Sequence, residues 1–133
     1  MNIETVSWGS LKVDDEQIYR FEKGIPGFEE QKAFARIELE DSPFFYLQSV
    51  SEPALSFLLT DPFTFYPNYE FEIPDQEVQE LGDEGSISVS CIVTIQGDLE
   101  TSTINLLAPV IANTATHQGK QIVLHNGSYQ TRH

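Results

Sequence analysis

The stretch "SISVSCIVTIQ", residues 86–96, decides the predicted fold. Apolar side chains alternate with hydroxyl-bearing ones through most of it, and a period of two residues is typical of a β-strand. One face carries Ile87, Val89, Cys91, Val93 and Ile95, and we expect this face to be buried. The serine-rich face is expected to point outward. Cys91 is therefore predicted to be a small buried core residue.

Short segments of similar character lie on both sides of this strand, separated by Gly, Pro, Asp or Ser. We predict strands at residues 2–7, 17–23, 33–39, 44–50, 55–60, 101–107 and 120–125. The Pro26-Gly27 pair predicts a type II turn. Residues 74–82 predict the one short helix, near 75–81, with Asp75 as N-cap and Gly82 as its stop. The expected fold is mostly β, a small antiparallel β-barrel-like single domain spanning residues 1–133.

The charge of the chain is strongly segregated. All seven Lys and Arg residues lie in the first 36 or last 14 residues, whereas residues 37–119 contain fourteen acids and no base. The formal net charge of −14 therefore resides in the middle of the chain. Such an acidic field repels nucleic acid phosphates and attracts basic partners. We expect no direct binding to nucleic acid. The plainer interpretation is that acidity keeps the protein soluble.

Residues for catalysis or metal binding are scarce. Cys91 is a single cysteine and cannot build a metal cluster or an internal disulfide. His117 and His125 stand eight residues apart without a second ligand pair, and no serine lies in a G-x-S-x-G elbow. We therefore expect no enzymatic activity, no cofactor and no metal.

The location of the protein is predicted from its apolar segments. The longest runs, such as "INLLAPVIA" at 104–112, are far shorter than the roughly 20 residues of a membrane span. The N-terminus lacks the basic start and apolar stretch of an export signal. We expect a cytoplasmic protein that does not enter a membrane.

Three segments, in this order, resemble a known family. "RFEKGIPGFEE" (20–30), "FLLTDPFTFYPNYEFEIP" (57–74) and "INLLAPVIAN" (104–113) are similar to the bacterial flagellar assembly factor FliW family. The resemblance covers essentially the whole chain. It implies a small β-barrel-like fold without enzymatic activity and two protein partners, flagellin and the carbon storage regulator CsrA.

The resemblance also implies a partner switch. Proteins of the FliW type bind CsrA, a basic RNA-binding dimer, and relieve its block on flagellin translation until unexported flagellin takes FliW away. Electrostatics alone suggests that carboxylates mimic RNA phosphates, whereas the family is understood to bind beside the RNA groove. The sequence leaves both mechanisms open.

Residues 69–84 are the predicted surface for CsrA, because they lie in the base-free middle of the chain and hold seven acids. Tyrosine beside charge is enriched at recognition surfaces. The candidates are Tyr69, Glu70, Glu72, Asp75, Glu77 and Glu80. Phe63 and Phe65, just before them, are expected to anchor the segment in the barrel. The alternative for the acids is a solvated face.

Flagellin is expected to meet an apolar surface, since an amphipathic helix docks in an apolar groove. The turn tip "GIPGF" offers Ile25 and Phe28. The run "INLLAPVIAN" offers Leu107, Val110 and Ile111 as anchors, with Asn105 as a polar locator; the alternative is that this run is core.

Two further function classes remain open at this point. In a small-molecule carrier or lyase-like barrel, the aromatics of residues 61–71 would line a deep pocket with His117 or His125 near carboxylates. A filled barrel interior would exclude this class. A generic acidic adaptor with another basic client is the second alternative.

Overall fold

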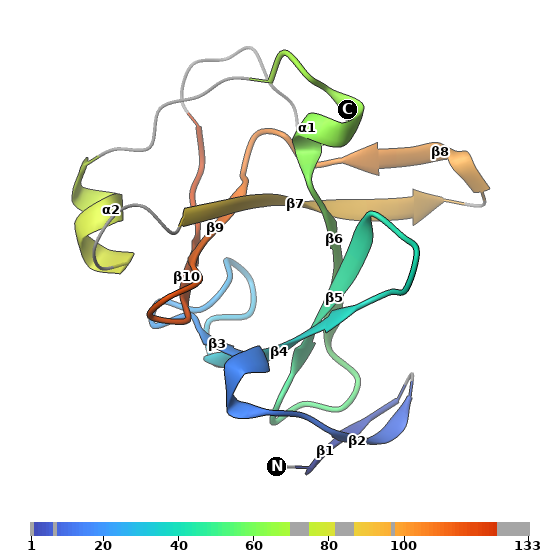
Figure 1. Ribbon diagram of the computed structural model, residues 1–133, viewed down its shortest axis with the longest axis vertical. Coiled ribbons are helices and arrows are strands. Elements are labelled where there is room, and N and C mark those ends of the chain that lie inside the picture. The colour runs from blue at the N-terminus through green and yellow to red at the C-terminus, as the bar shows by residue number, and fades with distance from the viewer. Residues whose placement is uncertain (1, 7, 70–74, 82–86, 97, 125–133) are drawn as a thin grey trace.

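The computed structural model describes residues 2–6, 8–69, 75–81, 87–96 and 98–124 (Figure 1). The described strands are β1 (Asn2–Thr5), β2 (Gly9–Lys12), β3 (Ile18–Arg20), β4 (Ala33–Glu38), β5 (Phe44–Ser49), β6 (Ser56–Thr60), β7 (Ile87–Gln96), β8 (Asp98–Ile104), β9 (Val110–Asn113) and β10 (Gln118–Gln121). The described helices are a 3-10 turn (Asp15–Gln17), α1 (Pro62–Phe65) and α2 (Asp75–Leu81). The prediction of a mostly β fold with a short helix near 75–81 is confirmed.

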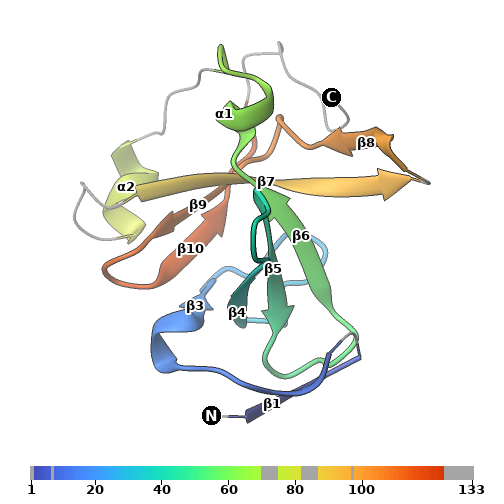
Figure 2. The same cartoon turned by 45° about the vertical axis from the view of Figure 1, so that its right-hand side comes forward.

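Seven strands close into a mixed barrel. Their order is β6-β5-β4-β3-β10-β9-β7, and pairing of β6 with β7 closes the ring. The β10–β3 pair is parallel, with Gln118 opposite Arg20, and the other pairs in the ring are antiparallel. β8 lies outside the ring and forms a hairpin with the far end of β7, which Figure 2 shows extending to one side. The β1–β2 hairpin is a separate sheet at the opposite end from α1.

The middle of β7 is covered on both faces. The prediction of an outward face is therefore wrong at Ser88 and Ser90, whereas Thr94 of the same face is exposed. Ser88 and Ser90 point into the ring, where they line the same small cavity as residues of β3, β4, β5, β6 and β9. Cys91 and Val93 point out of the ring but are covered by a second apolar layer. The prediction that Cys91 is buried is confirmed, and burial raises the pKa of its thiol to about 12.

The second layer packs on the outer side of β7 and β9. It is built from Tyr69, Leu81 of α2, Leu106 and the segment that follows β10. This segment was predicted as a strand over 120–125; β10 ends at Gln121, and two backbone bonds carry the pairing further. The amide of Ile122 donates to the Pro109 carbonyl at 3.0 Å, and that of Leu124 to the Leu107 carbonyl at 2.8 Å.

The predicted turn at Pro26-Gly27 is confirmed. The amide of Phe28 donates to the carbonyl oxygen of Ile25 at 2.7 Å, and Gly27 has a φ of 92°, which the third position of a type II turn requires. Gly24 also has a positive φ, and an added Cβ there would lie 2.4 Å from the Cα of Glu29. The returning chain can therefore pass close to Gly24.

Candidate partner-binding surface

The acidic helix α2 is held against the barrel at two levels. Leu81, its last residue, is buried in the outer apolar layer. The carbonyl oxygen of Leu81 accepts a hydrogen bond from Thr116 Oγ1 at 2.9 Å. Asp75 and Glu77 lie in the first turn, where carboxylates are favoured by the helix dipole. These contacts place the carboxylates of α2 beside β10.

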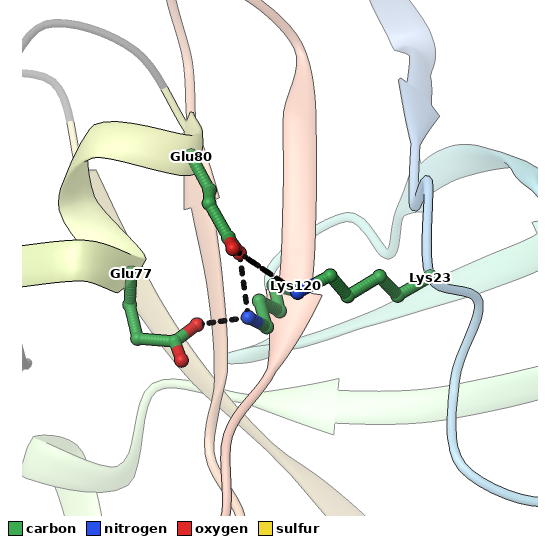
Figure 3. Close-up of polar contacts among 4 residues, drawn as sticks. All are labelled: Lys23, Glu77, Glu80 and Lys120. Carbon is green, nitrogen blue, oxygen red and sulfur yellow. Dashed lines mark hydrogen bonds and ion pairs between the residues drawn. The ribbon is translucent and has the colours of Figure 1, made fainter.

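Four side chains form what we call the ionic latch: Lys23, Glu77, Glu80 and Lys120 (Figure 3). Lys120 of β10 donates to Glu80 Oε2 at 2.7 Å and is ion-paired with Glu77. Lys23, from the loop after β3, donates to Glu80 Oε1 at 3.0 Å and Oε2 at 3.3 Å. The latch joins α2 to the loop after β3, in the first part of the chain, and to β10, the last described strand.

The latch keeps its central groups charged. Burial alone would lower the pKa of Lys120, but its hydrogen bonds to Glu77 and Glu80 outweigh burial and raise that pKa to about 12. The pKa of Glu80 is lowered, first by the hydrogen bond from Lys120 and then by that from Lys23. At neutral pH the latch is therefore a set of paired ions.

The predicted acids differ in accessibility. Asp75 and Glu80 are exposed, whereas Glu77 is half-buried beneath Lys120. Glu70 and Glu72 lie outside the described residues. Asp75 was expected to be the N-cap, but it is the first residue of the helix. Asp75 and Glu80 are thus the predicted contacts that a partner reaches most directly.

The expectation for the aromatic segment is wrong in both halves. Tyr69 is 4% exposed, and its hydroxyl donates to the Leu106 carbonyl oxygen at 2.7 Å. Phe63 and Phe65, expected in the barrel, are 41% and 43% exposed on α1. Both phenylalanines belong to the short helix α1, which begins at Pro62 after Asp61. One side of each ring is covered, Phe63 by Tyr69 and Phe65 by Phe44.

The apolar candidates also divide. Phe28 is 43% exposed and packs edge-on against Phe57, with ring centroids 5.3 Å apart. The expectation that Val110 and Ile111 are exposed is wrong: both are buried, because β9 lies between the ring interior and the outer layer. Ile25 is buried beneath the turn.

The other two candidates lie in the loop before β9. Leu107 is half-buried against the outer apolar layer. Asn105 is half-buried too, and its side-chain oxygen accepts from the Ala108 amide at 3.1 Å, so this residue shapes the loop. Phe28, Leu107 and Asn105 thus remain at least partly accessible to a partner.

Comparison with known proteins identifies the family. A sequence model described as "FliW protein" matches residues 2–133. The chain belongs to the FliW family. Among its relatives are proteins named "Flagellar assembly factor FliW" from Geobacillus sp. (strain WCH70) and Bacillus subtilis (strain 168). They are 42% and 43% identical over 135 and 136 residues, with all of this chain and 94% and 95% of theirs covered.

A solved structure extends this similarity to three dimensions. "Crystal structure of the flagellar assembly factor FliW" superimposes with a TM-score of 0.91 at 40% identity, covering 100% of this chain and 95% of that one. The resemblance to FliW predicted from three sequence segments is confirmed. FliW is a non-enzymatic family.

The barrel of this FliW chain has a filled interior. The cavity among Tyr19, Arg36, Ser88 and the surrounding apolar side chains measures about 20 Å³. A cavity of this size has room for about one water molecule. No group of His, Cys, Asp and Glu that could hold a metal ion occurs among the described residues. Nor is any described helix long and apolar enough to cross a bilayer. The interior therefore does not support a small-molecule carrier.

Sequence reasoning missed the bases of the latch. Lys23 and Lys120 are 97 positions apart (120 − 23), so no local pattern connects them. A signal was nevertheless present, because all the bases stand near the two ends of a chain with an acidic middle. If the ends pack on the middle, bases must meet acids. The fold provides this meeting at Glu80.

Proposed function

We propose that this chain is a cytoplasmic flagellar assembly factor that binds flagellin and the translational regulator CsrA. By binding CsrA it relieves repression of flagellin translation, and accumulating flagellin then displaces CsrA. Membership of the FliW family supports the assembly role. The partners rest on the family resemblance and on the charge of the chain.

The CsrA proposal rests on the way in which α2 is held against the barrel with some of its carboxylates exposed. Its carboxylates belong to a stretch of residues 37–119 without any base, and Asp75 and Glu80 are exposed there. The barrel fixes the helix through Leu81 and the latch, so these groups are presented without a large ordering cost. A basic RNA-binding protein is attracted to such a surface by charge.

For flagellin, Phe28 is the best-supported contact. It is a large apolar side chain at the tip of a turn whose backbone is fixed by Pro26 and Gly27. A rigid apolar projection loses little entropy when it enters a hydrophobic patch. We propose Leu107 and Asn105 as further contacts. The three buried candidates, Ile25, Val110 and Ile111, belong to the core and are not proposed as contacts.

One binding experiment tests whether CsrA and flagellin bind this protein and whether flagellin displaces CsrA. The tagged protein is incubated with purified CsrA, with flagellin and with both, and the complexes are separated by size-exclusion chromatography. We expect each partner to bind and flagellin to displace CsrA. A stable ternary complex, or no CsrA complex at all, would contradict the proposal.

The variant Asp75→Lys tests the acidic helix in the same assay. It should slow association with CsrA by about three- to tenfold at low salt, and this difference should shrink at high salt. Glu4→Lys makes the same charge change at an exposed site on β1 and is the matched control. Equal slowing in both variants would show that only net charge matters.

Adding labelled RNA to the CsrA complex separates the two mechanisms. Complete loss of RNA at saturating protein would favour phosphate mimicry. RNA that stays bound in the complex would favour binding beside the groove.

A further inference from the structure

The two lysines on Glu80 are held very differently. The Lys120 side chain is 17% exposed and is shared between Glu77 and Glu80. The Lys23 side chain is 64% exposed, and the ion pair that it forms is with Glu80. An exposed pair of this kind is weak, because water and salt screen it. Lys120 is therefore the permanent partner of Glu80, and Lys23 is exchangeable.

Lys23 borders a hollow between α2 and the strands β3 and β10. The hollow has a volume of about 240 Å³ and is lined by Arg20, Glu22, Lys23, Glu80, Leu81, Gln118, Gly119 and Lys120. Its apolar and backbone surface at Leu81 and Gly119 suits an aliphatic stem. Glu22 and Glu80 supply carboxylates for a cationic end, and they balance the charges of Arg20 and Lys120 once Lys23 has left. A volume of several water molecules admits one long side chain.

We propose that Glu80 and this hollow form a subsite for a lysine or arginine side chain of the basic partner, and that Lys23 pairs with the Glu80 carboxylate of this subsite in the free protein. The hydrogen bond from the Lys23 ammonium shows that the Glu80 carboxylate can bind the cationic end of a long side chain. This inference rests on the proposed binding of CsrA through α2. It adds that the free protein competes with its own partner at Glu80.

Exchange at this subsite leaves the helix in place. When Lys23 swings into solvent, Lys120 still pairs with Glu77 and Glu80, and Leu81 remains buried. An arginine of the partner gains more than Lys23 loses, because its planar fork can bond both oxygens of one carboxylate. A partner that holds a cation in position for Glu80 therefore competes well with Lys23, because Lys23 binds Glu80 only weakly.

The test compares the affinity for CsrA of the wild type and of Lys23→Met. Removing the internal competitor should tighten binding by about two- to fivefold, which corresponds to the strength of an exposed ion pair. Lys12→Met is the matched control, since it deletes an exposed lysine on β2 and changes net charge equally. We expect Lys12→Met to tighten binding clearly less than Lys23→Met. The second variant Lys23→Gln should behave like Lys23→Met.

The variant Glu80→Gln completes a double-mutant cycle with Lys23→Met. Glu80→Gln alone should weaken the binding of CsrA. When Lys23→Met is added to Glu80→Gln, the gain in affinity should be no larger than the gain that Lys12→Met gives. Unfolding midpoints of all variants establish that they are folded.

The outcomes separate the two proposals. If wild-type protein does not bind CsrA, the proposed function fails. If it binds, but Lys23→Met equals Lys12→Met or weakens binding, the internal competitor is refuted while the proposed function stands. An undiminished gain from Lys23→Met in the Glu80→Gln background would also refute it.

Discussion

Tyr69 connects three parts of the molecule that are separate in sequence. Its ring lies 5.7 Å from that of Phe63 on α1, its body packs in the outer apolar layer, and its hydroxyl bonds the Leu106 carbonyl. A tyrosine serves here because it has an apolar body and a polar tip. The residue is therefore a structural support within the outer apolar layer.

Tyr69→Phe should lower the free energy of unfolding by about 1–3 kcal/mol, because it leaves a buried carbonyl oxygen without its donor. The measurement is urea unfolding followed by far-UV circular dichroism. Tyr46→Phe is the control, since the hydroxyl of Tyr46 makes no hydrogen bond within the described part of the chain. Equal stability of the two variants would show that the Tyr69 hydroxyl is dispensable.

Among the elements, α2 depends most visibly on charge. The ionic latch and the burial of Leu81 hold a helix of seven residues, which is too short to be stable by itself in water. Its stability must therefore follow the ionisation of the latch.

The pH range of the latch follows from the two shifted pKa values. Glu80 has a lowered pKa, so its contribution is complete above the ordinary value of 4.5 and is lost as pH falls through the folded value. Lys120 has a raised pKa, so its contribution is complete below 10.5 and is lost as pH rises through about 12. The latch is fully formed between these limits.

Lys120→Met should therefore destabilise the protein most at neutral pH. The cost from its half-buried pair with Glu77 alone should be about 1.5–3 kcal/mol more than for Lys12→Met. Urea unfolding across the acidic range should show this difference shrinking as pH falls through the lowered pKa of Glu80. A difference that is independent of pH would indicate lost packing by the aliphatic stem instead.

The elements differ in how far sequence predicts them. The helix over 75–81 was predicted because Val78 and Leu81 are spaced for one face and turn residues flank them. α1 was missed, although Asp61 followed by Pro62 is a typical helix start, because four residues show no periodicity. β9 was also missed, since the run 104–112 reads as one apolar segment.

The two errors of burial have a common physical cause. Alternation along β7 reports that two faces differ, but it cannot report that a second layer covers the ring. Ser90 is consequently buried inside, where a small hydroxyl fits beside larger side chains, while Cys91 faces the added layer. The exposure of Phe63 and the burial of Tyr69 likewise depend on tertiary packing, which composition does not encode.

At the scale of the whole molecule, the geometry of the candidate site was not predictable from the sequence. The base-free middle predicted an acidic surface, and the structure shows that Asp75 and Glu80 of this stretch are exposed. The latch required knowledge that β3 and β10 are neighbours, and a parallel pair between distant strands leaves no local signal. Long-range closure also makes the parts of the barrel depend on one another.

Unfolding should therefore be a single transition in every probe. Trp8, the single tryptophan, packs edge-on against Tyr46 with centroids 4.8 Å apart and reports on the contact of the hairpin with β5. Far-UV circular dichroism reports on the barrel strands. Because Ile3, Val13 and Ala35 join the hairpin to β4 in one buried cluster, both signals should give the same urea midpoint.

An earlier midpoint for Trp8 fluorescence would show instead that the hairpin opens independently of the barrel. Trp8→Phe is the control, because its far-UV transition establishes whether the tryptophan itself affects barrel stability.

The parallel pair of β10 with β3 has a consequence for synthesis on the ribosome. Residues 18–20 emerge early, yet their partner strand and Lys120 are translated about a hundred residues later (118 − 20 = 98). Until then the nascent chain lacks both the strand that joins β3 to β9 in the ring and the lysine that pairs with Glu77 and Glu80 of α2. An unfinished chain therefore has no seated acidic helix. The contacts that hold α2 are therefore complete only in molecules that have been translated past β10.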